Sequence, residues 1–587
     1  MNILAAGKLY GPDYFIIVAY FVLMLGVGAY FYRYIKAMKD YFAGGNRIPW
    51  WLSGVSYYMS SFSAFAFVAY SGLAYKYGIF GVTFYWVTVP AAAFGVVFFA
   101  TRWRRARISS PVEYLESRYD SAVRQLFAWQ GIPQKIIDDA LKIVAIGMFL
   151  ATALNVPLKQ GMFWSSVIML AYTFMGGLWA VTVTDFLQFV VMMLAVLILF
   201  PLSLQAAFDK TGGLSEMIET APAGFFKPYT GDFNWVYLAT AVVLYCLSYS
   251  VNWGLVQRYY CVPTEKDAKK VGWLVVVLNI VTPPLMFMPA MLGRYFLPAL
   301  ADPNQAYPSL CVTLLPVGLL GLVVAAMFSA TMSMLSTDYN VCASVLTNDV
   351  YRRLIRPNAS QEQLVLVGRL MTLLVGLISL AVAFYIVSLE GAGGDKLFRW
   401  MITLFSVATA PVAVPMLAGL ITPKVTTRAA LIGFAAGVGV GLFMFFGLEE
   451  KFVFLKMTWM RENAIFLVAL AVTICLTAAI SWLDGQRQGT LPRVEQFLDR
   501  LRTPIGELDG DRVEEPARGD IISPFRIVGT STAIIGVLLI AITPWTRTRL
   551  GLVLDSVLGG FLVVSGVYVA WRSGRGSRTE TQLKSQE

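Results

Sequence analysis

The sequence lacks histidine entirely. This absence excludes histidine metal sites, histidine general bases and histidine proton relays. Cysteine is scarce as well: the five cysteines are scattered and none forms a Cys-x-x-Cys pair, so neither a zinc site nor a disulfide framework is indicated. Charged residues make up only 14% of the chain, whereas soluble domains carry about a quarter.

Apolar residues, at 57% of the 587 positions, take the place of the missing charge. They form long runs, and helices are the elements that satisfy their own hydrogen bonds in lipid. The sequence therefore predicts an all-α polytopic, integral membrane protein with about fifteen spans of bilayer length. The predicted spans lie near residues 14–32, 48–75, 80–99, 133–155, 159–175, 181–204, 236–256, 272–293, 316–351, 364–387, 398–420, 429–447, 464–482, 527–542 and 552–569.

The net charge of +11 comes from lysines and arginines in short loops between the apolar runs. Such loops are typical of the cytoplasmic side of a membrane protein, and the sequence contains no nucleic-acid-binding motif. Alternating the spans keeps the strongly basic loops on one side. We therefore expect a plasma (inner) membrane location, with the N-terminus outside and the C-terminus cytoplasmic. The N-terminal segment lacks the pattern of a cleaved signal peptide, so the first span is expected to be retained.

Polar side chains interrupt the apolar run at residues 316–351. Ser329, Ser333, Ser336 and Asn340 are spaced i, i+4, i+7, i+11 and share one helix face, with Thr337 and Asp338 beside them. In lipid this face must point into the protein. Hydroxyl and carbonyl oxygens suit small hard cations, so the face is a candidate cation site. The alternative is that small hydroxyl residues only allow close helix packing.

Two other spans carry polar residues. Residues 48–75 contain Ser60, Ser61 and Ser63, which fit either an unwound helix whose free carbonyls bind ions or an ordinary, tightly packed helix. Asp138 and Lys142 stand i, i+4 apart and can pair. They lie either at the membrane interface, with their charges reaching water, or along a solute path.

No Walker motif, Gly-x-Ser-x-Gly elbow or dinucleotide fingerprint occurs in the sequence. Any uphill transport must therefore draw on an ion gradient. The lack of histidine and of a clustered catalytic motif argues against a membrane-embedded enzyme, and no cofactor is expected.

Several segments together resemble the sodium/solute symporter family, which includes sodium–glucose, sodium–sialic acid and sodium–proline transporters. They occur in the family's order over residues 40–421. The segments are DYFAGGNRIPWW, SPVEYLESRY, MGGLWAVTVTDFLQ, NWGLVQR and GLLGLVVAAMFSATMSMLSTDYNVCASVLTNDVY.

This resemblance implies a leucine-transporter-like core of two inverted five-helix repeats, at residues 48–206 and 234–421. Residues 1–47 would form an extra N-terminal transmembrane helix and a cytoplasmic loop. Additional transmembrane helices are expected at 427–484 and C-terminal ones at 523–572. A cytoplasmic linker that includes a short surface helix would occupy 485–522, and a disordered tail 573–587.

The resemblance also implies sodium sites, with sodium as the coupling ion. One would use carbonyl oxygens of Met59, Phe62 and Ala330 and the hydroxyl of Ser333. At the next position, where the family has a second hydroxyl, this chain has Met334, whose thioether is a poor ligand for sodium. A second site, present in some members, would use Asp185, Ser336 and Thr337, all of which are intact. We therefore expect this second site to carry the coupling ion.

Solute-contacting positions are carried over from the family less specifically. The candidates for the solute site are Ser63, Ala66, Phe67, Ser71, Asp138, Asp139, Lys142 and Asn252. Sugar carriers of the bacterial type have a polar amide at the position of Ala66, which makes a plain hexose less suitable. An acid at 138 or 139 would repel a carboxylate solute unless Lys142 compensates. The expected solute is a neutral polyol or sugar derivative, or an amino acid or other amine.

Two functions remain open from the sequence. The first is a sodium-coupled symporter that imports a small polar organic solute by alternating access. The second is a membrane sensor or receptor of the same fold that binds solute without coupled transport, a function that Met334 favours. The sequence does not indicate the oligomeric state.

Overall fold

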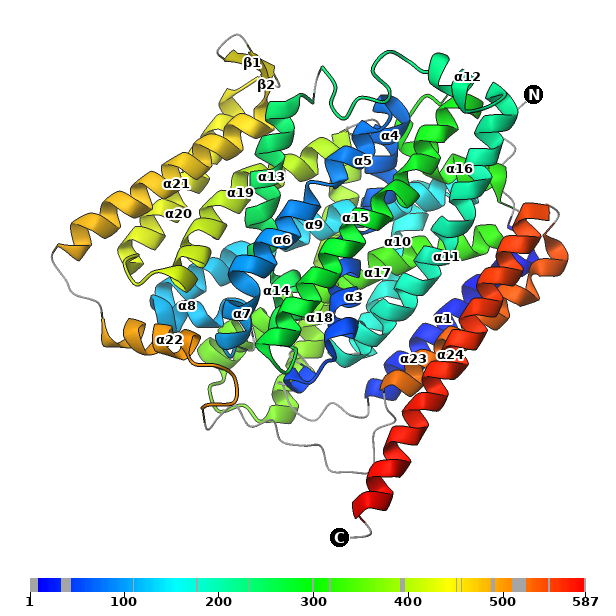
Figure 1. Cartoon of the computed structure of the whole chain (residues 1–587). Coiled ribbons are helices and arrows are strands. Elements are labelled where there is room, and N and C mark those ends of the chain that lie inside the picture. Colours follow the sequence, from blue (N-terminus) through cyan, green and yellow to red (C-terminus); the bar gives the residue numbers. More distant parts are fainter. Residues whose placement is uncertain are drawn as a thin grey trace.

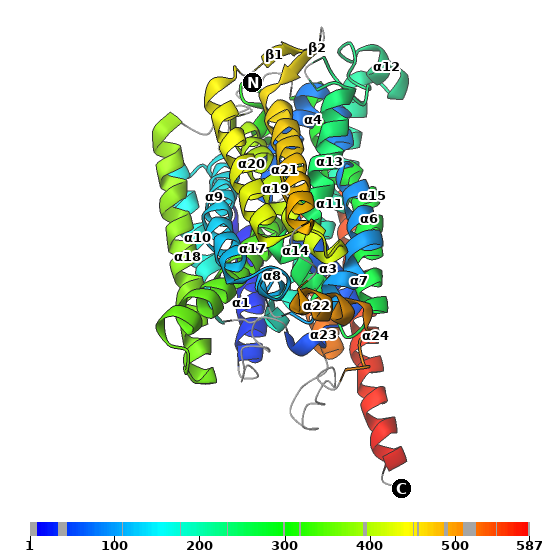
Figure 2. The same ribbon diagram turned by 90° about the vertical axis from the view of Figure 1, so that its left-hand side faces the viewer.

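The computed structural model describes residues 9–32, 44–108, 110–175, 178–231, 233–297, 300–315, 318–390, 396–449, 451–454, 457–486, 491–508, 524–546 and 549–584. These residues are almost entirely helical, and most long helices run in roughly the same direction through an elongated bundle (Figures 1 and 2). The N-terminal and C-terminal ends lie at opposite ends of this bundle (Figure 1).

The first half of the bundle contains the elements between the N-terminal helix and the first long connection. They are α1 (Gly11–Tyr32), η1 (Gly44–Asn46), α3 (Trp50–Met59), η2 (Ala66–Tyr70), α4 (Ser71–Tyr77), α5 (Phe80–Tyr85), α6 (Thr88–Phe94), η3 (Gly95–Ala100), α7 (Thr101–Arg105), α8 (Glu113–Arg118), α9 (Ser121–Leu154), α10 (Leu158–Met175), α11 (Leu178–Thr211) and α12 (Leu214–Glu219).

The second half begins with another interrupted helix. Its elements are α13 (Trp235–Val251), α14 (Trp253–Tyr260), α15 (Glu265–Phe296), η4 (Pro303–Gln305), α16 (Ala306–Leu314), α17 (Leu319–Val345), η5 (Leu346–Ile355), α18 (Gln361–Glu390) and α19 (Lys396–Ile421).

The remaining elements flank this core. They are α20 (Thr427–Gly447), β1 (Lys451–Phe454), β2 (Met457–Met460), α21 (Arg461–Gly485), α22 (Pro492–Arg502), α23 (Pro524–Ala541), η7 (Thr543–Trp545) and α24 (Arg549–Lys584).

Two features of the flanking region differ from the sequence analysis. The strands β1 and β2 pair antiparallel, Lys451 opposite Met460, and cap α20 and α21 where no strand was expected. The helix α24 continues to Lys584, whereas a disordered tail was expected from residue 573. The expected surface helix in the 485–522 linker is present as α22, while residues 487–490 and 509–522 of that linker lie outside the described residues.

Among the described residues, eleven helices are long and apolar enough to cross a membrane, and two bent helix pairs raise the number to 13. The expectation of about fifteen spans was higher because it counted two segments as additional spans. It treated α9 and α10 as separate spans, and these helices bend by 117° relative to one another. It also counted the segment Trp50–Tyr77, whose pieces are individually short.

Each half of the core begins with a broken helix. In the first half α3 ends at Met59, the backbone is non-helical at 62–63, and the chain continues through η2 into α4. In the second half Asn252 separates α13 from α14, which bend by 54°. The two broken helices run in opposite directions: α3 lies below α4 and α13 above α14 (Figure 1). The segment 48–75 is therefore the unwound helix rather than an ordinary packed one.

The helix α17 lies at the centre of the molecule, with 94% of its most apolar window buried. All four residues of its polar face, Ser329, Ser333, Ser336 and Asn340, are buried, as lipid exclusion requires. Its N-terminus is held by α1, because Asp13 Oδ1 accepts hydrogen bonds from the backbone N–H groups of Gly318 and Gly321, each 2.8 Å. The polar face is thus fixed inside the bundle.

Candidate sodium and solute site

The break after α3 lies directly against α17. The hydroxyls of Ser60 and Thr337 are 3.0 Å apart, and the backbone N–H of Ala64 donates to Thr331 Oγ1 at 3.1 Å. These two contacts bracket the non-helical turn, and both Phe62 within the turn and Met59 directly before it are buried. Met59 and Phe62 on the broken helix and Ala330 and Ser333 on α17 therefore belong to one buried region.

Asp185 on α11 is fully buried in the same region. Its Oδ2 accepts a hydrogen bond from Ser56 Oγ. Its Oδ1 and the Ser333 hydroxyl lie next to each other and have no other hydrogen-bond partner in the described part of the chain. Ser336 Oγ donates to the Ser333 carbonyl at 3.2 Å. A buried oxygen without a partner costs free energy, and a small hard cation is the ligand such oxygens suit.

Arg258 on α14 reaches this same group of residues. Its Nε donates to Ser56 Oγ at 2.7 Å, and its Nη2 donates to Thr337 Oγ1 at 2.8 Å. Nη2 also lies 3.3 Å from Ser60 Oγ and 3.5 Å from Asp185 Oδ2. One guanidinium therefore joins both broken helices to α17 and α11. Asp185 and Thr337, expected as sodium ligands, already share a protein cation.

Met334 occupies a different environment from its neighbour Ser333. Ser333 is fully buried between helices, whereas Met334 is half-buried and lines a cavity beside the break in the first helix. The position at which the family has a second hydroxyl ligand thus presents a thioether to this cavity. This arrangement leaves the first expected sodium site without its fifth oxygen.

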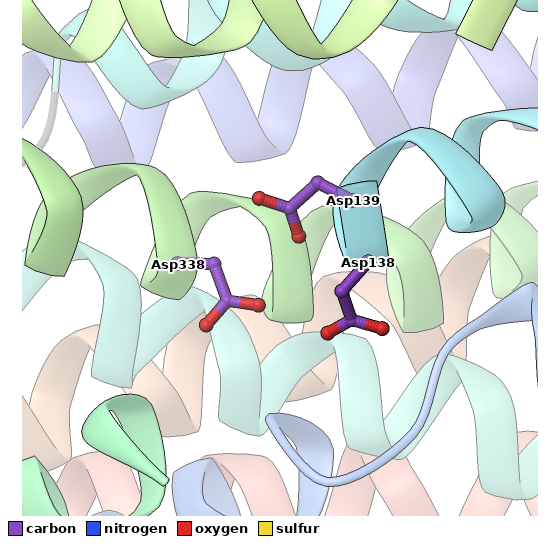
Figure 3. A group of neighbouring side chains, drawn as sticks. All are labelled: Asp138, Asp139 and Asp338. Atoms are coloured by element: carbon purple, nitrogen blue, oxygen red, sulfur yellow. The ribbon is translucent and has the colours of Figure 1, made fainter. Parts of the chain in front are cut away.

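A group of charged side chains joins α9 to α17. Figure 3 shows Asp138 and Asp139 on α9 facing Asp338 on α17. Carboxylate oxygens of the three residues lie within 4.8 Å of one another, a spacing that a metal ion could bridge. However, Lys142 Nζ lies 2.9, 3.0 and 2.8 Å from Asp138, Asp139 and Asp338 respectively. The Lys142 ammonium group therefore neutralises the three carboxylates at the position that a metal ion could otherwise occupy.

Lys135 completes this charge cluster, which we define as Lys135, Asp138, Asp139, Lys142 and Asp338. Its Nζ lies 2.7 Å from Asp338 Oδ1 and 3.4 Å from Asn252 Oδ1. Asp338 directly follows Thr337, so one turn of α17 carries both the Arg258 contact and the cluster. The pairing of Asp138 with Lys142 matches the sequence expectation. Both are buried, which places them inside the protein and not at the membrane interface.

A cavity of about 70 Å³ lies between the two broken helices, enough to hold several water molecules. Five of the expected solute residues line it: Ser63, Ala66, Asp138, Lys142 and Asn252. The other three do not. Phe67 packs edge-on against Tyr307, Ser71 is fully buried, and Asp139 faces Lys142 behind the cavity wall.

The cavity is closed toward the end that holds α4 and α12. Tyr70 and Tyr245 share a hydrogen bond of 2.8 Å, and the Tyr70 ring stacks between Phe84 and Phe287. In the other direction a second cavity of about 50 Å³ continues from Asp138 and Asn252 along α9 to Phe127. A polar path therefore leads from the cavity toward the arginine-rich end formed by α7 and α8 (Figure 1).

Sequence reasoning missed several residues of this site. Tyr70, Tyr85, Tyr245 and Tyr249 line the cavity with their rings and hydroxyls, and Lys135 and Arg258 supply cations. Lys135 could have been found, because positions 135, 138, 139 and 142 fall on one helix face. Tyr245, Tyr249 and Asn252 also repeat at i, i+4 and i+7. For Arg258 the only signal in the sequence was its place in the motif NWGLVQR, because its partners come from three other elements.

The model of the sodium:solute symporter family matches residues 41–437. A sodium/glucose cotransporter from Vibrio parahaemolyticus is 26% identical over 500 residues, which cover 79% of this chain and 90% of that protein. A sodium/sialic acid symporter from Proteus mirabilis is 26% identical over 463 residues, covering 75% and 91%.

The structure of a substrate-bound, outward-open Na⁺-coupled sialic acid symporter superposes with a TM-score of 0.70. It is 22% identical and covers 81% of this chain and 98% of its own. At this identity the likeness is one of fold. The shared fold is the leucine-transporter-like core of inverted five-helix repeats, with an additional N-terminal helix and additional C-terminal helices.

Proposed function

Because the chain belongs to the sodium:solute symporter family, we propose that it imports a small polar organic solute together with sodium by alternating access. The observation that carries the proposal is the pair of buried oxygens Asp185 Oδ1 and Ser333 Oγ between α11 and α17, which lie next to each other and have no other partner among the described residues. They lie behind a broken helix whose other side lines the cavity. Sodium and solute would then bind on opposite sides of the same backbone turn.

The coupling ion would be held by Asp185, Ser333, Ser336 and Thr337. Their oxygens are hard ligands of the type that alkali cations prefer. Arg258 would remain paired with Asp185 Oδ2, so that Oδ1 could bind the ion. Sodium bound here would stabilise the contact between α11, α17 and the turn after Met59, and so favour the solute-competent state. The site lacking a hydroxyl at Met334 would contribute less.

The solute would be neutral or carry an amine. Serine hydroxyls, an asparagine amide and tyrosine hydroxyls line the cavity, and these groups hydrogen-bond sugars and polyols as well as amines. The charge cluster has three carboxylates and two ammonium groups, which disfavours a carboxylate solute unless an amine accompanies it. Named relatives carry glucose and sialic acid, so the panel of test solutes should include sugar derivatives.

We place the arginine-rich end on the cytoplasmic side of a plasma (inner) membrane. The location of α7, α8 and α22 at the same end as the C-terminus supports this orientation (Figure 1), since basic loops favour the cytoplasmic side. The N-terminus would lie outside. The cavity would then be closed to the exterior by Tyr70 and Tyr245 and connected toward the cytoplasm.

Uptake into proteoliposomes tests the function. Labelled sugars, polyols, amino acids and amines are offered with an inward sodium gradient and with potassium in its place. Sodium-dependent accumulation of one class supports symport. Saturable binding of a solute without accumulation under either gradient would identify the sensor or receptor instead, the function that Met334 favours.

The ion site is tested separately by Asp185→Asn and Ser336→Ala. Both are expected to abolish or strongly reduce sodium-stimulated uptake while solute binding at high sodium persists. Ser203→Ala on α11 is the matched control, because among the described residues the Ser203 hydroxyl bonds only to the Leu199 carbonyl of its own helix. Unchanged sodium stimulation in Asp185→Asn would refute the ion site without refuting transport.

A further inference from the structure

A large basic cavity lies at the end of the bundle that carries α8 and α22, and none of the expected sodium or solute residues lines it. It has a volume of about 1020 Å³ and is enclosed by α8, the α19–α20 connection, the last turns of α21 and the start of α22. Four basic side chains line it: Arg118, Lys424, Arg428 and Arg493. Among the described residues that line it, Asp484 is the single carboxylate.

The positive charge of this cavity is poorly neutralised by the protein. Asp484 lies 3.7 Å from Arg428 and accepts a hydrogen bond from Thr426 Oγ1 at 2.8 Å. In the part of the chain that the structure describes, no carboxylate pairs with the side chains of Arg118, Lys424 or Arg493. An anion that enters the cavity would therefore contact several cationic side chains. Among the described residues, only the Asp484 carboxylate would compete with it for them.

Arg118 is the buried member of this group, with a relative exposure of 2%. Its guanidinium donates to the carbonyls of Gly419, Thr422 and Val425 at 3.1, 2.7 and 2.9 Å. Burial lowers the pKa of Arg118 and the like charge of Arg493 acts in the same direction, yet a guanidinium stays charged in proteins. The cavity wall thus contains a fixed positive charge, which backbone carbonyls and the Tyr119 ring, 4.6 Å from the guanidinium, partly offset.

A polar atom without a partner also lines the cavity. The Ser481 side chain is 8% exposed, and its hydroxyl has no hydrogen-bond partner among the described residues. It lies one turn before Asp484 on the cavity side of α21. A hydroxyl donor beside arginine and lysine groups is the combination that recognises phosphate oxygens.

The membrane supplies the occupant that fits this position. α21 is a membrane-spanning helix, and its last turns expose Trp482 and Leu483 next to the cavity. Tryptophan at a helix end is typical of the headgroup level of a bilayer. Earlier on the same helix Ile474 is also exposed, so acyl chains can lie along α21 while the headgroup enters the cavity.

We propose that this cavity binds the phosphate headgroup of an anionic phospholipid, with Lys424, Arg428, Arg493 and Ser481 contacting the phosphate. The lipid joins the α19–α20 connection, α21 and α22 at the cytoplasmic interface. Basic pockets between helices on that side are known to suit such headgroups. The site is independent of the sodium and solute site.

The test measures thermal unfolding of the purified full-length protein in detergent. Short-chain phosphatidylglycerol, short-chain phosphatidylcholine and glycerol phosphate are titrated separately. Phosphatidylglycerol is expected to raise the midpoint in a saturable manner, and the other two are not. An equal effect of phosphatidylcholine, or saturation by glycerol phosphate at the same concentration, would overturn the lipid assignment, the latter in favour of a soluble phosphate ester.

The decisive variant combines Lys424→Gln, Arg428→Gln and Arg493→Gln. It is expected to weaken phosphatidylglycerol binding at least tenfold. The matched control combines Lys269→Gln, Arg352→Gln and Arg356→Gln, which removes the same kinds of exposed charge elsewhere and is expected to bind normally. An equal loss in the control would mean that only net charge matters and would refute the site. If the triple variant does not fold, Arg493→Gln alone must weaken binding at least twofold.

Discussion

The guanidinium of Arg258 lies 3.5 Å from the carboxylate of Asp185 in the centre of the bundle, and both side chains are fully buried. Asp185 lies on α11 in the first half of the core and Arg258 on α14 in the second half, and each also bonds Ser56. A buried carboxylate without a counter-charge is strongly unfavourable. Arg258 therefore stabilises Asp185, and under the proposed function sodium would be a second cation that acts on the same carboxylate.

This relationship predicts the behaviour of Arg258→Gln. Without sodium the variant leaves a buried carboxylate without a cation, which costs about 3–5 kcal/mol, so its thermal midpoint falls well below that of the parent protein. With sodium the site gains its counter-ion without competition. The sodium-induced rise in midpoint is therefore expected to be larger than in the parent protein.

Thermal unfolding in sodium and in potassium measures this effect. Arg369→Gln, on α18 outside this site, is the control and should respond to sodium as the parent protein does. A midpoint of Arg258→Gln that is equal in sodium and potassium would contradict the assignment of the ion to Asp185.

Met334→Ser is predicted to strengthen sodium binding. The substitution replaces a thioether at the cavity wall with a hydroxyl beside Ser333, at the position where the resemblance implies a ligand. One added oxygen ligand is worth about 1 kcal/mol, or roughly fivefold in affinity. The sodium concentration for half-maximal uptake should fall by that factor. Met401→Ser, on α19 and lining the same cavity, should leave it unchanged.

The polar face of α17 and the Asp138–Lys142 pair followed from helical spacing alone. Once the membrane excludes exposed charge, a face with Ser333 and Ser336 can only point inward, and an i, i+4 pair needs no tertiary information. The contacts of Arg258 with Asp185 and of Lys135 with Asp338 join helices from the first and second halves of the core. Their geometry depends on how the broken helices pack, which local spacing does not encode.

Two flanking elements show a second limit of prediction from the sequence. The strands β1 and β2 have four residues each, too few for an alternating pattern to stand out beside two long apolar helices. The last turns of α24 are polar, with the composition of a disordered tail, and are helical to Lys584 in continuation of the long apolar helix. In both cases the neighbouring span decides the local structure more than composition does.

Lys142→Met is predicted to be the most destabilising single change in the charge cluster. Lys142 contacts three carboxylates, so its removal leaves only Lys135 to neutralise them and costs about 3–5 kcal/mol. Lys135→Met should lower the stability less, because Asp338 would still be paired with Lys142. The double variant Lys142→Met with Asp138→Asn should recover part of the loss, since one buried charge is removed with its partner. Denaturation midpoints of the four proteins measure the order; equal losses for both lysines would contradict it.

An ion-pair network at the arginine-rich end predicts a pH dependence. Glu116 on α8 lies 2.8 Å from Arg124 on α9 and 2.6 Å from Arg353 on η5. Hydrogen bonds from Arg353, with a further contribution from Arg124, lower the pKa of Glu116. A carboxyl whose pKa is lowered by folding stabilises the protein above its unfolded pKa, about 4.3, and loses that contribution as the pH falls through the folded value.

Glu116→Gln should therefore lower the thermal midpoint at pH 7, and the difference from the parent protein should shrink as the pH falls below about 4.3. Because Glu116 is 36% exposed, solvent screening keeps the effect modest. Glu495→Gln, an exposed residue of α22, serves as the control and should show no such convergence. The network joins α8, α9 and η5, so its loss is expected to loosen the arginine-rich end where the polar path approaches the surface. A difference between Glu116→Gln and the parent protein that stayed constant from pH 7 to pH 3 would show that Glu116 acts through packing rather than charge.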